Sequence, residues 1–291
     1  MLPNPNDLVE VLRLLALKPR VVDAVWSAIE AYLPSRPPDR HPLGCHRPRI
    51  PDRDCFTGIL LRLVTGCSWD VAARFAPAGE TTLRTRCNEW IDAGVFDRVA
   101  DEAVAAYDRI IGLNLAEVAL DASQQKAPMG GEGTGFNFHD RGKQGWKWTL
   151  LVDADGVPLG WVAGSAQPHD STFVAATLDD ADQRGLLDGI GTLHMDRGYR
   201  YQRVVQECTE RGLERLDIPA RRKGTRGVRR RTHLLNMGPR WPVERTNSWL
   251  TNFGQLRRNT DRRTRQRQAQ LSLAIALIIT VKLVKRADRW G

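Results

Sequence analysis

The stretch Ala116-Glu-Val-Ala-Leu-Asp121 decides the fold, because a short apolar run ends there in an acidic residue. The same arrangement recurs in Gly191-Thr-Leu-His-Met-Asp196. Short apolar runs of this kind are typical of buried strands, and carboxylates are rarely placed beside buried strands without a partner. If the two strands are neighbours in one sheet, Asp121 and Asp196 meet at one edge.

A third acid, Glu244, lies in Arg240-Trp-Pro-Val-Glu244, a helical stretch in the most basic quarter of the chain. Residues 221–291 hold 19 basic and 3 acidic side chains, a net charge of +16, whereas residues 1–220 have a net charge of −7. Such a basic quarter indicates a polyanionic partner. Convergent carboxylates indicate a divalent metal, so the pattern favours chemistry on phosphate. The alternative is a merely soluble basic surface.

The pattern between residues 115 and 219 predicts a mixed α/β sheet with helices on its faces. We expect strands at 116–120, 146–152, 159–163, 191–195 and 213–218, and helices at 171–184 and 200–211. Asp153-Ala-Asp-Gly156 is typical of a turn joining the second and third strands. The Gly-rich stretch 130–145 is interpreted as a loop.

Residues 1 to about 110 are predicted to be all-helical, with helices at 8–17, 21–32, 52–64, 69–75 and from 81 or 82 to 93. Gly66 and Ser68 have the positions of a helix end and a helix cap. The last two helices resemble a helix-turn-helix, with Arg84 and Arg86 at the start of its recognition helix. The alternative is a plain helical bundle.

Two features favour a cytoplasmic location, in the bacterial nucleoid, over a membrane. The apolar run 271–284 is shorter than the ~20 residues that span a bilayer, and it is interpreted as a buried helix. The opening residues lack the pattern of a secretory signal. The five cysteines form no Cys-x-x-Cys pair, which suits a reducing compartment.

These motifs together resemble bacterial insertion-sequence transposases of the DDE type, in insertion-sequence family five. The resemblance covers nearly the whole chain and rests on these motifs: Leu120-Asp121, Gly145-Trp-Lys-Trp-Thr149, Asp153-Ala-Asp-Gly-Val-Pro158, Gln167-Pro-His-Asp170, His194-Met-Asp-Arg-Gly-Tyr199, Arg240-Trp-Pro-Val-Glu-Arg-Thr-Asn247 and Phe253-Gly-Gln-Leu-Arg-Arg258. Two positions depart from the family pattern: Met237 stands where Tyr is frequent, and Thr251 where Lys or Arg is frequent.

The resemblance implies an RNase H-like catalytic domain without a large insertion, and a chemistry for the three acids. Asp121, Asp196 and Glu244 would be the catalytic residues and would hold two Mg²⁺ ions, with Mn²⁺ as a possible substitute and Asp121 as the bridging ligand. Water would attack the DNA first, and the freed 3′-hydroxyl would then attack target DNA. The partners implied are double-stranded DNA, as terminal inverted repeats and as target, and a second copy in a homodimeric synaptic complex.

Two arginine clusters are expected to contact DNA phosphates, which position a protein without reading sequence. The loop 221–231 has seven basic residues in eleven and is expected to order on DNA. The second cluster runs from Arg257 to Arg267. The predicted DNA contacts are Arg84, Arg86, Arg221, Arg222, Lys223, Arg226, Arg229, Arg230, Arg231, Arg240, Arg257 and Arg258.

Several alternatives stay open at this point. The chain is either an active transposase, an RNase H-fold nuclease without strand transfer, or an inactive DNA-binding derivative. Each acid also has a purely structural interpretation. Asp121 is then an acidic residue in a turn, and Glu244 is the ion-pair partner of Arg240 four residues earlier. His169-Asp170 is interpreted as a helix cap rather than as a metal ligand. The expected division is a helical domain at 1–112, a catalytic domain at 113–260 and a basic helix at 261–291 packing on the core.

Overall fold

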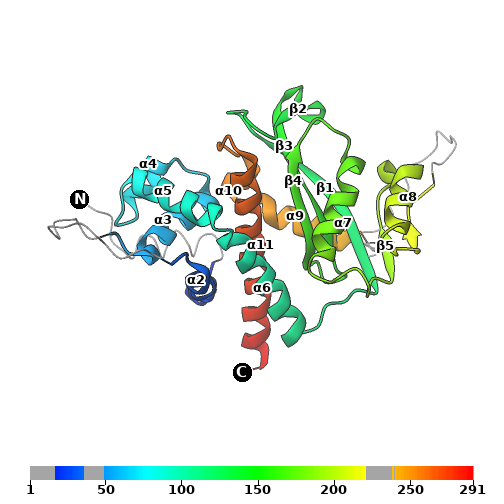
Figure 1. Ribbon diagram of the computed structural model, residues 1–291, viewed down its shortest axis with the longest axis horizontal. Helices are drawn as coiled ribbons and strands as arrows, with labels where there is room; N and C mark the ends of the chain where they lie inside the picture. Colours follow the sequence, from blue (N-terminus) through cyan, green and yellow to red (C-terminus); the bar gives the residue numbers. More distant parts are fainter. Residues whose placement is uncertain (1–16, 36–48, 221–237, 239, 291) are drawn as a thin grey trace. The chain divides into compact units, whose positions relative to one another are not determined.

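A computed structural model of the protein describes residues 17–35, 49–220, 238 and 240–290 (Figure 1). The chain forms two compact units, one of residues 106–251 and one that combines residues up to 105 with residues 252–291. The division expected from the sequence set its boundaries after residues 112 and 260. The predicted separate C-terminal segment differs from the structure, because it belongs to the same unit as the N-terminal helices.

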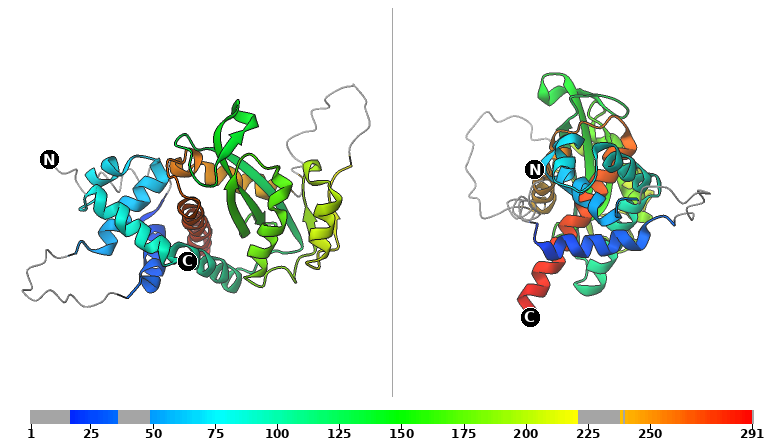
Figure 2. Two further views of the ribbon diagram at one scale, coloured as in Figure 1. Left: turned by 45° about the horizontal axis from the view of Figure 1, so that its top comes forward. Right: turned by 90° about the vertical axis from the view of Figure 1, so that its left-hand side faces the viewer.

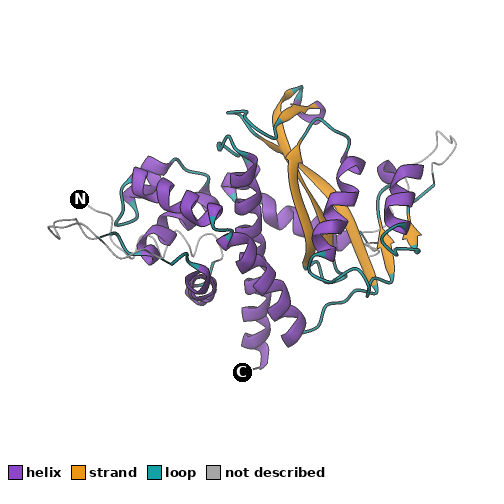
Figure 3. Ribbon diagram, viewed as in Figure 1, coloured by secondary structure: helices purple, strands orange, loops and turns teal. Residues whose placement is uncertain are grey.

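The unit of residues 106–251 is built on a six-stranded mixed sheet, whose strands are orange in Figure 3. The strands are β1 (Glu117–Lys126), β2 (Gly135–Asn137), β3 (Lys143–Val152), β4 (Pro158–Ser165), β5 (Thr192–His194) and β6 (Leu216–Asp217). The central strand β1 pairs antiparallel with β3 and parallel with β5. On the outside, β6 runs parallel to β5, and both β2 and β4 run antiparallel to β3.

The remaining elements of this unit are helical: η1 (Phe138–Asp140), η2 (Asp170–Phe173), α7 (Val174–Asp182), η3 (Arg197–Tyr199), α8 (Gln202–Thr209) and α9 (Trp241–Thr251). Alternating residues of β1 separate the two faces of the sheet. Val118 and Leu120 lie in an apolar core with residues of α7 and α8. Asp121 belongs to the opposite face, which α9 packs against, and Figure 1 shows α7 and α9 on different sides of the strands.

The predicted mixed sheet with flanking helices is therefore confirmed, with three local differences. Strand β1 continues five residues beyond Asp121, so that acid lies within a strand rather than at its end. The stretch predicted as a loop contains β2 and η1. The helix expected from residue 171 begins as the short η2, in which the His169 side chain accepts from the Ser171 N–H, as a helix cap does.

The helical unit contains α2 (Pro19–Tyr32), α3 (Asp52–Thr65), α4 (Trp69–Arg74), α5 (Glu80–Asp92), α10 (Gly254–Arg257) and α11 (Thr264–Trp290). Helix α6 (Val95–Ile110) runs from it into the sheet unit. The predicted caps are confirmed, since Gly66 ends α3 at a φ of 73° and the Ser68 hydroxyl accepts from Val71 N–H. The predicted helix at 8–17 lies outside the described residues, apart from its last position.

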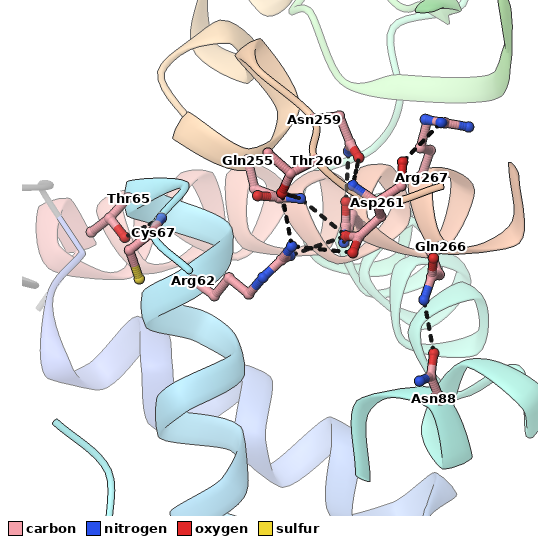
Figure 4. Close-up of polar contacts among 11 residues, drawn as sticks. Arg62, Thr65, Cys67, Asn88, Gln255, Asn259, Thr260, Asp261, Gln266 and Arg267 are labelled. Carbon is pink, nitrogen blue, oxygen red and sulfur yellow. Dashed lines mark hydrogen bonds and ion pairs between the residues drawn. The ribbon is translucent and has the colours of Figure 1, made fainter. Parts of the chain in front are cut away.

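The carboxylate of Asp261 is the centre of a buried polar network in the helical unit (Figure 4). Arg62 of α3 donates from Nη1 and Nη2 over 3.0 and 3.1 Å, and Gln255 Nε2 donates over 3.0 Å. Gln270 of α11 also donates to Asp261. Because one carboxylate joins α3, the segment after α10 and α11, this network fixes the C-terminal segment on the N-terminal helices.

Helix α11 is long and apolar enough, by length and composition alone, to cross a membrane. Most of its apolar part is buried within the protein, where it packs on α2 and α5 (Figure 2). Burial of this kind is typical of the core helix of a folded domain, and the predicted buried C-terminal helix is confirmed.

Candidate active site

The pairing of β1 with β5 brings the first two acids to the same level of the sheet. Ala119 pairs with His194 in parallel register, and Asp121 and Asp196 each stand two residues further along their chains. Asp196 follows the last residue of β5 and caps η3, where it accepts from the Gly198 N–H. A Cβ at Gly198 would lie 2.7 Å from Asp196 Oδ1, so a larger residue there would displace this carboxylate.

The third acid, Glu244, lies in the first turn of α9, and the three residues that follow it attach this helix to the sheet. Arg245 donates to the Asp155 carbonyl over 2.6 Å, and the Thr246 hydroxyl donates to the Gly156 carbonyl over 2.8 Å. The Asn247 amide oxygen accepts from Trp148 Nε1 over 2.8 Å in a buried contact. These contacts hold the Glu244 turn against the face that carries Asp121.

Arg240 contacts two of the acids. Its Nη2 lies 4.0 Å from Asp121 Oδ2 and 3.6 Å from Glu244 Oε1. The interpretation of Glu244 as an i,i−4 partner of Arg240 is thus realised in the structure, and the same guanidinium also faces Asp121. Arg240 therefore supplies positive charge between two carboxylates that come from different elements.

Burial raises the pKa of Asp121 to about 6 from its ordinary value of 3.8. The charges of Asp196 and Asp170 act in the same direction, whereas the Ala122 backbone N–H and Arg240 lower the pKa. Negative charge at Asp121 is therefore only partly compensated by the protein. A cation bound beside it would lower the free energy of the ionised form.

Three further residues belong to this neighbourhood, and sequence reasoning gave them no role in the chemistry. Lys147 of β3 is fully buried and its Nζ lies 2.5 Å from Asp170 Oδ1. Tyr199 is buried, and burial, followed by the charges of Asp121, Asp170 and Asp196, raises its pKa well above the ordinary value. One signal in the sequence marks this region: Lys147 is a charged residue between two tryptophans in an apolar strand.

The chemistry of the donors suits a hard divalent cation, because carboxylate oxygens are the ligands that Mg²⁺ prefers. The raised pKa of Asp121 and the closely placed Asp196 agree with a site that a cation completes. Among the described residues, no three His, Cys, Asp or Glu side chains are close enough to hold one metal ion. The structure brings the acids to one region of the sheet without assembling a coordination sphere.

The predicted DNA contacts fall into several groups. Arg84 is exposed on α5, and Arg257 and Arg258 are exposed at the end of α10. Arg262 and Arg263 are also exposed. The residues of the basic loop, Arg221, Arg222, Lys223, Arg226, Arg229, Arg230 and Arg231, lie outside the described residues, and so does Met237.

Two arginines have positions that differ from the prediction. Arg86 is buried and forms an ion pair with Asp52, because α5 turns this side chain toward the start of α3. Arg267 of the second cluster is also buried and donates to the Asp261 carbonyl over 2.8 Å. Both guanidinium groups are occupied inside the helical unit, so this structure does not present them to DNA as expected.

A family model described as "Transposase DDE domain" matches residues 115–279, more than half of the chain. The chain belongs to the DDE transposase family. A second model, described as "Putative transposase of IS4/5 family (DUF4096)", matches residues 21–100. The two matches together account for both compact units and agree with the resemblance drawn from the motifs, and the DDE domain implies an RNase H-like fold.

Two Burkholderia cepacia proteins are similar to parts of the chain. One, named "Putative transposase for insertion sequence element IS402", is 35% identical over 136 residues, which are 45% of this chain and 60% of that protein. The other, named "Insertion element IS402 uncharacterized 16.2 kDa protein", is 31% identical over 119 residues, 40% of this chain and 80% of that protein. The chain thus spans about 60% of the first relative. No solved structure matches the chain.

Proposed function

We propose that the chain is the transposase of an insertion sequence, which cuts DNA at the ends of its element and joins the freed 3′-hydroxyl to target DNA. The observation that carries this proposal is the placement of Asp121 and Asp196 at one level of neighbouring strands, with Glu244 on the helix that packs against the same face. Family membership supports the same reading, since the DDE domain covers all three acids.

Asp121, Asp196 and Glu244 would hold two Mg²⁺ ions, for which Mn²⁺ is a substitute. Such ions, when bound, stabilise charge on the attacking and leaving oxygens of a phosphodiester. The partly buried Asp121 would be the ligand shared by both ions. Arg240 contacts Asp121 and Glu244 in the structure, and we infer that it turns to a DNA phosphate when cations take over the neutralisation of these acids.

The exposed arginines of the helical unit would bind DNA phosphates. Arg257, Arg258, Arg262 and Arg263 make no ion pair with any residue that the structure describes, so their charge is available to phosphates. The loop 221–231 adds seven basic residues by sequence alone. The partners proposed are element ends and target DNA, bound by a homodimer that pairs two ends, in the cytoplasm at the nucleoid.

The test uses the full chain with DNA that carries the sequence flanking its gene. Asp121→Asn, Asp196→Asn and Glu244→Gln are each expected to abolish Mg²⁺-dependent cleavage and to leave DNA binding within about twofold of wild type. Asp182→Asn, at an exposed acid of α7, is the matched control and should cleave normally.

Joining of the cut end to a supercoiled plasmid, read by sequencing the junctions, separates transposase from nuclease. Cleavage without joined product would favour an RNase H-fold nuclease. DNA binding with no cleavage by the wild-type chain in either Mg²⁺ or Mn²⁺ would favour an inactive DNA-binding derivative.

A further inference from the structure

Lys147 carries a fully buried ammonium group, which needs compensating partners inside the protein. It lies on β3 between Trp146 and Trp148, and its side chain is 0% exposed. Burying a charge is costly unless it is paired and hydrogen-bonded. Lys147 Nζ donates to Asp170 Oδ1 over 2.5 Å and to the Pro168 carbonyl, and it lies 5.3 Å from the centre of the Phe173 ring. The lysine thus fixes the segment that begins η2.

Asp170 is fixed through only one of its two oxygens. Oδ1 accepts from Lys147, whereas Oδ2 accepts no hydrogen bond from any residue that the structure describes. The Asp170 side chain is about one-third exposed, so this second oxygen is not enclosed by the protein. The carboxylate is therefore held in place by Oδ1, while Oδ2 remains available to a ligand.

The segment that carries Asp170 packs against the turn that carries Asp196. Element η2 contacts η3, which Asp196 caps. The rings of His169 and Tyr201 lie edge to face with centres 5.4 Å apart, and Arg203 of α8 donates to the Ser171 carbonyl over 3.0 Å. These contacts join the start of η2 to the chain that follows Asp196.

The packing of η2 against η3 places Asp170 beside the Asp196 turn, and the electrostatic effects on nearby groups agree with this placement. The charge of Asp170, with that of Asp196, raises the pKa of Asp121. The same three carboxylates raise the pKa of Tyr199. A carboxylate that acts on both Asp121 and Tyr199 belongs to the same neighbourhood as the proposed catalytic centre.

Tyr199 gives an independent indication that something binds there. Its hydroxyl is buried and has no hydrogen-bond partner among the described residues. Leaving a buried hydroxyl unpaired costs roughly 1–3 kcal/mol. A ligand or its hydration water among the carboxylates would supply the missing partner.

We propose that Asp170 supplies a fourth carboxylate to the divalent-metal site, with Oδ1 held by Lys147 and Oδ2 available to the cation. This inference rests on the proposed function, because it takes Asp121 and Asp196 as the first ligands. Lys147 is the positioning residue. It contacts one oxygen of Asp170 and leaves the other to the cation, so the ion pair orients the ligand without closing the site.

The test is Mn²⁺ binding to the full chain without DNA, measured by titration calorimetry and by the electron paramagnetic resonance signal of free Mn²⁺. Asp170→Asn keeps an oxygen that accepts from Lys147 and removes the negative charge. We expect it to weaken Mn²⁺ binding by about 10- to 100-fold, the usual range for losing a supporting group of a metal site. Asp182→Asn, at an exposed acid of α7, should bind Mn²⁺ like wild type.

The outcomes separate the two proposals. If wild type binds Mn²⁺ and Asp121→Asn does not, but Asp170→Asn binds like wild type, the fourth carboxylate is refuted while the proposed centre stands. If Asp121→Asn leaves Mn²⁺ binding unchanged, the proposed function fails, and the inference fails with it. Thermal unfolding of each variant in EDTA verifies that Asp170→Asn is folded.

A second measurement uses the wild-type chain and requires no variant at Asp170. Fe²⁺ with ascorbate and peroxide cleaves the backbone next to a bound ion. We expect cuts near residues 121, 196 and 168–171, all suppressed by excess Mg²⁺. Cuts near 121 and 196 without any at 168–171 would overturn the inference.

Discussion

Replacing Asp121 by Asn should make the metal-free protein more stable, although it removes a residue proposed to be essential. The reason is the environment of this carboxylate. Burial, and then the neighbouring Asp196 and Asp170, disfavour its ionised form and raise its pKa from 3.8 to about 6. Asparagine has nearly the same shape, keeps an oxygen that accepts from the Ala122 N–H, and carries no charge to desolvate.

The size and sign of the effect follow from the pKa difference between the folded and unfolded states. Because the folded pKa is raised, the stability that Asp121 contributes is fully present below pH 3.8 and is lost as the pH rises through 6. Each pKa unit corresponds to about 1.4 kcal/mol, so ionised Asp121 costs up to about 3 kcal/mol at pH 8. At pH 4 the cost should be less than about 1 kcal/mol.

Urea unfolding in EDTA, followed by circular dichroism at pH 4 and pH 8, measures this difference. Asp121→Asn should exceed wild type in free energy of unfolding by up to about 3 kcal/mol at pH 8 and by much less at pH 4. Asp182→Asn, at an exposed acid, should match wild type at both values. An Asp121→Asn protein no more stable than wild type at pH 8 would refute the electrostatic argument. So would a gain that is equal at both pH values.

Three further predictions concern other parts of the chain. Asp261→Ala should lower the free energy of unfolding by about 3–5 kcal/mol, because it leaves the buried Arg62 unpaired; Arg62→Met/Asp261→Leu should lose less than half as much in the same urea assay, and a loss at least as large would contradict this reasoning. Changing Arg257, Arg258, Arg262 and Arg263 to Gln should flatten the salt dependence of DNA binding by about 0.9 in log–log slope for each phosphate that the protein no longer neutralises. Arg265→Gln, which removes a residue paired with Asp92, should change that slope less. Iodoacetamide at pH 8 should alkylate the partly exposed Cys67 but not Cys87 or Cys208, whose pKa values burial raises to about 12. Mass spectrometry of the peptides measures the modification, and rapid alkylation of Cys87 would contradict its burial.

The sequence was sufficient to predict the mixed sheet, since apolar runs of four to seven residues separated by turns leave few alternatives. It also indicated that Asp121 and Asp196 would meet if their strands were neighbours, and Ala119 does pair with His194. The end of β1 was not predictable in this way. Ser123, Gln124 and Gln125 form a polar run, and only pairing with β3 makes it a strand.

The burial of individual charged residues could not be predicted from the sequence either, because it also depends on contacts with residues distant in the chain. Arg86 stands in a helical stretch of mixed charge and Arg267 in a basic one, and both stretches have the composition of exposed surfaces. Arg86 is buried because it pairs with Asp52, 34 residues earlier in the chain. Arg267 is buried because the segment around Asp261 folds so that its carbonyl accepts from this guanidinium. Lys147 is a third example, because the oxygens that justify its burial lie on a loop about 20 residues further along the chain.

The three proposed catalytic acids have different local supports, and this difference bears on how the centre would assemble. Asp121 is fixed by strand pairing, and Asp196 is fixed by its own turn with Gly198. Glu244 depends on contacts made by the next three residues, and its own side chain is about half exposed. Arg240 contacts Asp121 and Glu244 at 4.0 and 3.6 Å, so it partly offsets the negative charge of these two acids in the protein alone. The last adjustment in forming a metal site would therefore be made at the start of α9, where Glu244 and Arg240 exchange partners, while Asp121 and Asp196 stay in place.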